Sequence, residues 1–387
     1  MCDDRISPEL RPLAPSIAVS DADHDLLTQR DQPESTHLYR TPFVRDCGRI
    51  LHARAFRRLA GKTQVFTRNQ MENDHSRSRL THTLEVAQIA RTIASALGLN
   101  AHLAEALALV HDIGHPPFGH AGERALDAAL VPHGMRFDHN LHALRIVTSF
   151  EERHAGFRGL NLTLGVREGI IKHSRDYSAA EHPELSAYFL DQLPPVEAQL
   201  IDLADEIAYL TADLEDGIEA GILDLKIVRA ELACFDRAYR SAEEKYPSAA
   251  ERLLRNDALK TILNSLVTDL MSEVSRRVET NGIHTLSQVR SARGRLAAFS
   301  ADRQEDRGTL RRFLYHYLYE STELEVEHKR GAEIICTLFA HWIADPEQLP
   351  ADHAARAAKE GAARAVTDYI AGMTDSYIEQ AWSRFQR

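Results

Sequence analysis

The sequence is poor in cysteine and aromatic residues and contains no long hydrophobic run. Its four cysteines are far apart in 387 residues and form no CxxC pair, which excludes a small disulfide-stapled domain and argues against a structural zinc knuckle. No stretch approaches the roughly 18 consecutive apolar residues of a membrane helix, and the first residues lack the apolar core of a signal peptide. We therefore expect a soluble, cytoplasmic protein without a membrane partner.

Charged residues are plentiful but unevenly distributed. Asp and Glu number 57 against 46 Lys and Arg, which gives a net charge of −11. Residues 40–80, in contrast, hold ten basic residues and three acidic ones, a local charge of +7. Such a basic segment fits an anionic ligand held at one place. The alternative is a solvated helix face whose arginines pair with acids elsewhere in the chain.

Apolar periodicity predicts an all-α protein. Residues 1–38 carry four prolines and no sustained period, so we expect a mobile N-terminal arm there. Beyond it, apolar residues recur three and four positions apart almost everywhere, as in amphipathic helices. We expect a helical core over 39–220, with the chemistry within about 78–216, and a C-terminal helical region over 221–387 that packs on this core.

Histidine is concentrated in one part of the chain, because twelve of the twenty lie between positions 75 and 182. His82 falls on the apolar face of a predicted helix, where a lone histidine is more often a hydrogen-bonded core residue than a ligand. His111 and Asp112 end the next predicted helix, just before Gly114. Together they can present two ligands to one cation, although this dipeptide is also common by chance.

The loop that follows Gly114 contains two adjacent prolines flanked by glycines, which can fix side chains at set separations. Glu123 follows His120 by three residues as the next predicted helix begins, so the two side chains can meet. A carboxylate beside an imidazole fixes its tautomer and raises its basicity, as a general acid or base requires. The alternative is a pair of solvent-facing polar residues.

A further ligand is offered by the predicted helix 196–216, which has two apolar stripes and should be buried on two sides. Asp205, Tyr209 and Asp213 are spaced four apart and lie on one face. A buried acid is costly unless it is paired or bound to metal, so Asp205 is a candidate ligand. The alternative is a buried ion pair with a basic residue of the 40–80 segment.

The order His82, His111, Asp112, Asp205 resembles that of the HD-domain metal-dependent phosphohydrolases. Longer strings resemble one branch of that family, the bacterial dGTPase-like deoxynucleoside triphosphate triphosphohydrolases. These strings cover residues 56–59, 62–66, 78–86, 111–123, 137–140, 204–209 and 368–375. The resemblance implies an HD-domain helical core with additional C-terminal helices.

The resemblance also implies a reaction and a cofactor. The family hydrolyses a deoxynucleoside triphosphate such as dGTP at the α-phosphorus and releases deoxynucleoside and intact triphosphate. Two imidazoles and two carboxylates leave positions open on an octahedral divalent ion, so we expect Mn or Mg foremost, with Fe, Co or Ni as alternatives. No further histidine pairs resemble the extra ligands of two-metal HD proteins, so we expect one ion per site.

Residue roles follow from the same resemblance. The resemblance implies that His120, oriented by Glu123, takes part in proton transfer or in the in-line attack step. The expected substrate contacts are Arg79 and His115 at the phosphates, Tyr209 and Asp213 at the sugar, and Gln64 and His139 near the sugar and phosphates. The family also leads us to expect a homo-oligomer.

Two alternatives remain open at this stage. An HD phosphohydrolase acting on another nucleotide ester, such as a nucleoside monophosphate, would release orthophosphate instead of triphosphate. A regulatory HD protein that binds single-stranded nucleic acid through its basic segment would show salt-sensitive binding. The intact set of ligand and acid-base residues argues against the second alternative.

Overall fold

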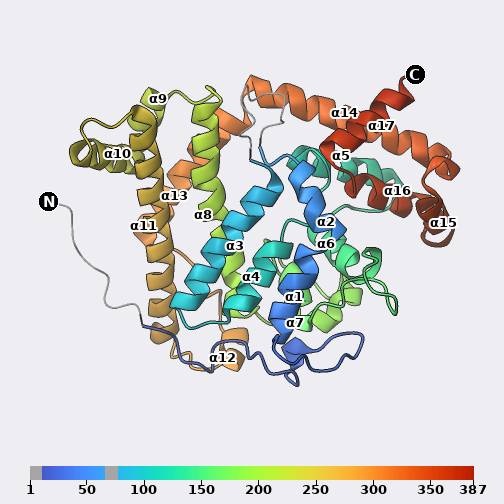
Figure 1. Ribbon diagram of the computed structural model, residues 1–387, viewed down its shortest axis with the longest axis horizontal. Coiled ribbons are helices and arrows are strands. Elements are labelled where there is room, and N and C mark those ends of the chain that lie inside the picture. The colour runs from blue at the N-terminus through green and yellow to red at the C-terminus, as the bar shows by residue number, and fades with distance from the viewer. Residues whose placement is uncertain (1–10, 66–76) are drawn as a thin grey trace. The chain divides into compact units, whose positions relative to one another are not determined.

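The computed structural model describes residues 11–65 and 77–387, and these are largely helical (Figure 1). No strand forms in the described ranges, where extended pairing is limited to two isolated bridges, Thr63 with Ser78 and Glu152 with Gly159. The all-α prediction is therefore confirmed. Parts of two predicted features, residues 1–10 of the arm and 66–76 of the basic segment, lie outside the described residues. No described helix has both the length and the apolar character needed to cross a membrane.

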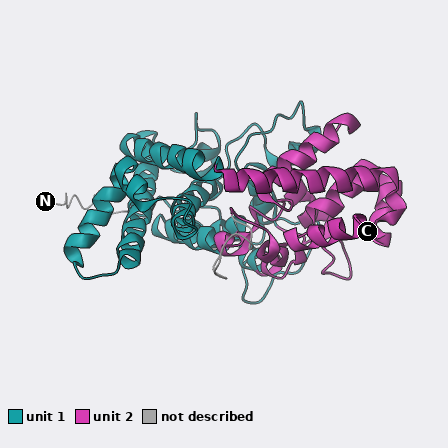
Figure 2. Ribbon diagram, turned by 90° about the horizontal axis from the view of Figure 1, so that it is seen from above, with its two compact units in different colours: residues 1–47, 84–108, 163–320 teal, residues 48–83, 109–162, 321–387 magenta. Residues whose placement is uncertain are grey.

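The chain forms two compact units that interleave along the sequence (Figure 2). Unit 1 comprises residues 1–47, 84–108 and 163–320, and unit 2 comprises residues 48–83, 109–162 and 321–387. These units differ from the consecutive regions expected on either side of residue 220. The difference arises because a unit is defined by which distant segments pack together, and local periodicity does not report that.

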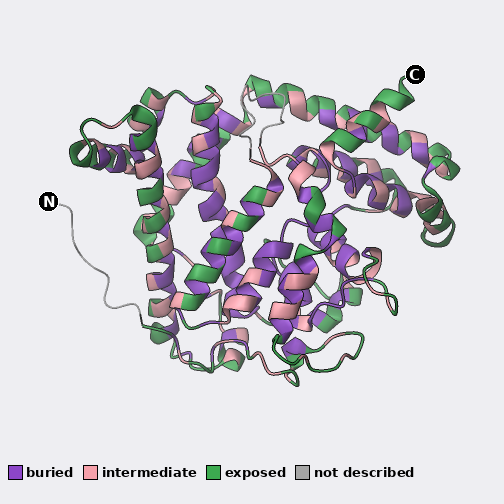
Figure 3. Cartoon of the chain, viewed as in Figure 1, coloured by how far each residue is buried: buried purple, intermediate pink, exposed green. Residues whose placement is uncertain are grey.

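Unit 1 contains most of α3 (Arg79–Ala96) and α4 (Ala101–Val110), and its longer helices follow residue 163. Helix α8 (Val196–Glu219) is buried on both of its apolar stripes, as predicted; Leu200 and Ile207 lie on one stripe, Ile201 and Ala208 on the other (Figure 3). The remaining helices of this unit are α7 (Leu164–Ile171), α9 (Leu225–Glu231), α10 (Ala233–Lys245), α11 (Glu251–Thr280), α12 (Leu286–Arg290) and α13 (Ala301–Leu314).

Residues 11–38 differ from the expected mobile arm, because they pack on unit 1. Leu13 and Ile17 are buried. The Leu13 N–H donates to the Leu97 carbonyl at 2.8 Å, and the Ser16 carbonyl accepts from the Leu286 N–H at 2.8 Å. The segment has no sustained helical period because it consists of turns, irregular stretches and one short 3-10 helix, Leu26–Thr28, yet some of its apolar side chains are still buried.

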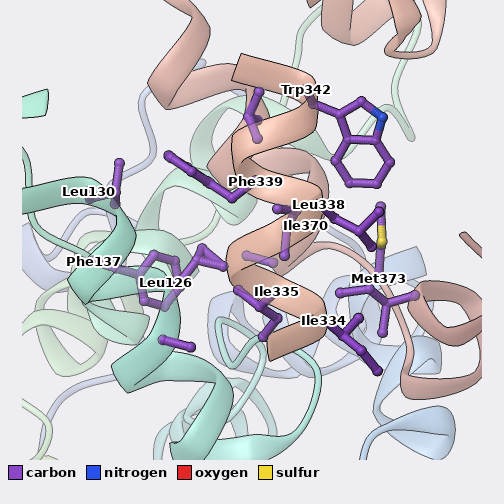
Figure 4. Packing of buried hydrophobic residues seen from close by; sticks show 14 of the residues in the cluster. Leu126, Leu130, Phe137, Ile334, Ile335, Leu338, Phe339, Trp342, Ile370 and Met373 are labelled. Carbon is purple, nitrogen blue, oxygen red and sulfur yellow. The ribbon is translucent and has the colours of Figure 1, made fainter. Parts of the chain in front are cut away.

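Unit 2 is organised around the packing of α5 (Gly119–Leu130) against α14 (Thr322–Ala344), with α16 (Ala362–Ala371) alongside (Figure 4). Leu126, Ile335 and Ile370 are fully buried there, and each such side chain contributes about 1.5–3 kcal/mol of burial free energy. The other helices are α2 (Arg54–Arg58), α6 (His139–Arg145), α15 (Ala351–Glu360) and α17 (Asp375–Phe385), and α1 (Pro42–Leu51) ends in this unit. This core anchors α5, which begins directly after the histidine-rich loop.

Candidate active site

Unit 2 brings two of the predicted metal ligands together. His82 lies in the first turn of α3, and His111 lies in the turn directly after α4. Their ring centroids are 5.9 Å apart, and one ring nitrogen of each lies within 4.8 Å of the other. Both side chains are buried. The predicted position of His82 on a buried helix face is therefore confirmed.

Asp112 is a buried carboxylate held between basic groups. Arg79 Nη1 donates to its Oδ2 at 2.7 Å, and His115 Nε2 lies 3.0 Å from its Oδ1. His111 Nε2 lies 3.6 Å from Oδ2. Burial opposes ionisation, but Arg79, His111 and His115 outweigh it and hold the pKa of Asp112 well below its usual value. The site therefore keeps a negative charge away from water.

These residues fit a divalent cation. Imidazole nitrogens and a carboxylate suit Mn, Fe, Co or Ni, and each carboxylate oxygen has a second lone pair beyond the contacts above. His82, His111 and Asp112, three of the four predicted ligands, belong to unit 2. Asp205 lies on α8 in unit 1, so its ligation stays a prediction from the sequence.

His115 is buried beside the same carboxylate. Burial, together with the charges of Arg79 and His139, lowers the pKa of His115 well below its usual value, so the ring is neutral near pH 7. It stacks on His139, with centroids 4.1 Å apart and an angle of 14° between the planes. The structure thus joins two predicted substrate contacts that lie far apart in the sequence.

Glu123 contacts three imidazoles. It accepts a hydrogen bond from the His139 backbone N–H at 3.2 Å, and its Oε1 lies 2.8 Å from His139 Nδ1. His120 Nδ1 lies 3.6 Å from Oε2, and His115 Nδ1 lies 3.8 Å from it. Burial opposes ionisation of Glu123, but His120 and His139 outweigh it and lower its pKa. The predicted pair of His120 and Glu123 is in contact, whereas the hydrogen-bonded partner of Glu123 is His139.

The loop between Asp112 and α5 has an uncommon backbone. Phe118 and Gly119 both adopt left-handed conformations, with φ of 61° and 56°. Such a φ is rare for a bulky residue and persists only where the surroundings enforce it. A Cβ at Gly114 would lie 2.0 Å from the His139 carbonyl oxygen, so only glycine allows this approach of the loop to α6.

Two polar atoms near this loop have unused bonding capacity. Across residues 11–65 and 77–387, the buried Arg79 Nε and Gln64 Oε1 have no hydrogen-bond partner. Buried polar groups are usually paired, so an exception calls for an explanation. A bound anion or a polar ligand group would supply the missing partners.

The remaining predicted residues lie on α8 in unit 1. Asp213 is buried there and accepts a hydrogen bond from the Tyr319 hydroxyl at 2.5 Å. Tyr209 donates to Glu206 at 3.4 Å; burial and the neighbouring acids Glu206 and Asp205 raise its pKa. The contact of Tyr319 with Asp213 was not predicted from the sequence, because Tyr319 lies in a π-helical turn, Tyr315–Tyr319. The available signal was a run of aromatic residues at every second position, a spacing that does not fit one face of an α-helix.

Comparisons with known proteins agree with this arrangement. The sequence model of the HD domain matches residues 79–210, and that of the phosphohydrolase-associated domain matches residues 297–384. A deoxyguanosinetriphosphate triphosphohydrolase-like protein of Thiobacillus denitrificans is 44% identical over 366 residues, which cover 94% of this chain and 96% of the relative. Relatives with the same description occur in Caulobacter sp., 41% identical over 92% of each chain, and in Leptospira interrogans, 40% identical over 98% of each chain.

His82 and His111, the two predicted ligand histidines, and the loop that follows His111 lie inside the matched region, and the identities extend over nearly the whole chain. HD domains bind divalent metals, and unit 2 contains imidazole and carboxylate groups that are candidate ligands for one. The chain therefore belongs to the family of deoxyguanosinetriphosphate triphosphohydrolase-like proteins, which are HD-domain phosphohydrolases.

Proposed function

We propose that the protein hydrolyses deoxynucleoside triphosphates, dGTP among them, at the α-phosphorus and releases deoxynucleoside and triphosphate. The observation that carries this proposal is the buried network of Arg79, Asp112, His115, His139 and Glu123, which links a metal-binding carboxylate to an acid-base group. The names of the relatives support the choice of substrate.

The proposed cofactor is one divalent ion, Mn or Mg foremost, with Fe, Co or Ni as alternatives. Its proposed ligands are His82, His111, Asp112 and Asp205. When bound, such an ion polarises a phosphoryl oxygen and lowers the pKa of a bound water. The unused Arg79 Nε–H belongs to the guanidinium that contacts Asp112, where it can donate to a phosphate oxygen, and His115, whose Nε2 lies 3.0 Å from Asp112 Oδ1, is proposed as a second contact to the phosphates.

We assign proton transfer to His120, whose side chain is 73% exposed and thus accessible to substrate, with Glu123 at 3.6 Å orienting it. Gln64 and His139 are proposed as further contacts to the sugar and phosphates. Asp213, held by Tyr319, and Tyr209 are proposed to contact the sugar. A homo-oligomer, a cytoplasmic location and a regulatory single-stranded nucleic acid remain predictions from composition and family.

Product analysis tests the proposal. Purified protein with Mn or Mg is incubated with each of the four deoxynucleoside triphosphates and with GTP, and the phosphate products are separated. We expect triphosphate from at least one deoxynucleotide and a loss of activity of at least about 100-fold in Asp205→Ala, because a cation ligand is removed. If every reaction gave pyrophosphate or no product, the proposed triphosphohydrolase reaction would be refuted. If Asp205→Ala kept full activity, the assignment of Asp205 as a metal ligand would be refuted.

A further inference from the structure

The start of α17 is joined to the histidine-rich loop of unit 2 by one carboxylate. Asp375, the first residue of α17, accepts the Phe118 N–H at its Oδ1, at 3.0 Å. Its Oδ2 accepts the Thr63 N–H at 2.7 Å and the Thr63 hydroxyl at 2.5 Å. The carboxylate thus ties α17 to the loop and to the segment that precedes α3.

Lys62 makes a second connection next to the first. Its Nζ donates to the carbonyl of His115 and, at 2.9 Å, to the carbonyl of Ala371, the last residue of α16. Its own carbonyl accepts the N–H of Arg79, the first residue of α3, at 3.1 Å. The Lys62 residue is only 4% exposed. It therefore links the end of α16, the loop and the start of α3 in a region without water.

The loop depends on outside support because Phe118 is strained. Its φ of 61° costs on the order of 1–3 kcal/mol for a residue with a side chain. The Phe118 ring lies directly on the backbone of α14, where a Cβ at Gly331 would approach the ring to 2.9 Å. Helices α14 and α17 therefore contact Phe118 directly, and the end of α16 is connected to the loop through Lys62.

We propose that Lys62 and Asp375 are positioning residues of the candidate active site. Through them the C-terminal helices fix residues 115–119, so that His115 stays against Asp112 and α5 begins where it presents His120. Neither side chain is assigned to substrate or metal, and both act through the loop. The catalytic consequence rests on the proposed function, whereas the effect on the loop does not.

Hydrogen exchange measures the loop without any substrate. In Asp375→Asn an amide donor replaces one accepting oxygen and faces a backbone or hydroxyl donor, so the contact opens. We expect the backbone amides of His115, Phe118, Gly119 and His120 to exchange about tenfold faster than in the wild type, since Pro116 and Pro117 have none. Glu379→Gln is the matched control, because Glu379 also lies on α17, but its 3.2 Å ion pair is with Arg330 of α14 and not with the loop.

Kinetics then separates positioning from general stability. We expect kcat for triphosphate release to fall about 100-fold in Asp375→Asn and in Lys62→Met, because His120 is misplaced. KM should change less, because His115 is the one proposed substrate contact that lies in the loop. Thr63→Val, which leaves α17 intact, should show a smaller loss in the same direction, and Thr63→Ser should restore the wild-type values.

Unchanged loop exchange in Asp375→Asn, or equal acceleration in Glu379→Gln, would overturn the proposal. If Asp375→Asn does not fold, the comparison of Thr63→Val with the wild type decides in its place, because valine replaces the hydroxyl that contacts Asp375 by a methyl group of similar size. Thr63→Ser retains this hydroxyl. A wild-type protein that releases no triphosphate would refute the proposed function, while the exchange data would still decide the positioning role.

Discussion

Lys62 is a basic side chain in an almost fully buried position. Burial, followed by repulsion from Arg58 and Arg79, lowers its pKa from 10.5 to about 7, against the attraction of Asp375 and Asp112. A neutral lysine amine still carries two N–H groups, which match its two carbonyl acceptors. The residue can therefore satisfy its hydrogen bonds without holding a charge in the protein interior.

The lowered pKa of Lys62 predicts a pH dependence of stability. Between about pH 7 and about pH 10.5 the unfolded chain holds a proton at this residue that the folded chain lacks, so the free energy of unfolding rises with pH. The slope is at most about 1.4 kcal/mol per pH unit, and it vanishes below about pH 7, where both states are protonated.

Urea unfolding of the wild type and Lys62→Met between about pH 6 and about pH 9 measures this slope. The stability of the wild type relative to the variant should increase above neutral pH. A difference that stays constant with pH would contradict the lowered pKa. The hydrogen bonds that the variant cannot make change the size of the difference but not its slope.

Individual contacts were predictable where they are local in sequence. His120 and Glu123, three residues apart on one helix, lie in contact as expected. The shorter contact of Glu123, to His139 sixteen residues later, depends on how α6 packs beside α5, and no spacing rule reports that. The hydrogen bonds between Asp375 and Thr63 join residues 312 positions apart in the sequence. They also depend on how distant elements pack, so no rule based on local spacing predicts them.

At the scale of elements, Gly114 sets how closely the loop approaches α6. A Cβ there would lie 2.0 Å from the His139 carbonyl oxygen and 2.6 Å from the Ala143 nitrogen, both of which are backbone atoms. Backbone atoms of a packed helix cannot move aside as the end of a flexible side chain can. The loop and α6 must therefore separate if a side chain is added.

We expect Gly114→Ala to lower the free energy of unfolding by about 1–3 kcal/mol or more through this overlap. Gly48→Ala is the matched control, because Gly48 lies inside α1 with no atom within 4 Å of an added Cβ. Alanine there should stabilise the protein by about 0.5–1 kcal/mol, as glycine in a helix is unfavourable. Thermal or urea unfolding compares the two, and equal effects would contradict the overlap.

The type of each element was easier to predict than its boundaries or partners. Helix α8 was expected over 196–216 and extends over Val196–Glu219, because its apolar stripes are long and regular. Residues 11–38 were expected to be mobile, yet Ile17 is fully buried, since an irregular segment can bury side chains without any period. The π-helical turn at Tyr315–Tyr319 places Tyr319 against Asp213, and helical periodicity does not predict such turns.

At the scale of the whole molecule, a cation that binds only the folded chain should stabilise it by mass action. At about 100 times its dissociation constant the gain is about 2.7 kcal/mol. We expect the melting temperature to rise with added Mn and to fall when a chelator is added, as thermal unfolding in the presence of either reagent would show. His82→Ala should abolish this response, whereas His316→Ala, at a side chain 72% exposed, should retain it. An undiminished response in His82→Ala would contradict the assigned ligand.

The interleaving of the two units has a consequence for how the protein is made. Thr63 and Phe118 leave the ribosome long before Asp375, which is 312 residues beyond Thr63. Contacts between such distant residues form late, after the loop between them has closed. The histidine-rich loop of a growing chain therefore lacks its contacts with α14 and α17 until these two helices have been made.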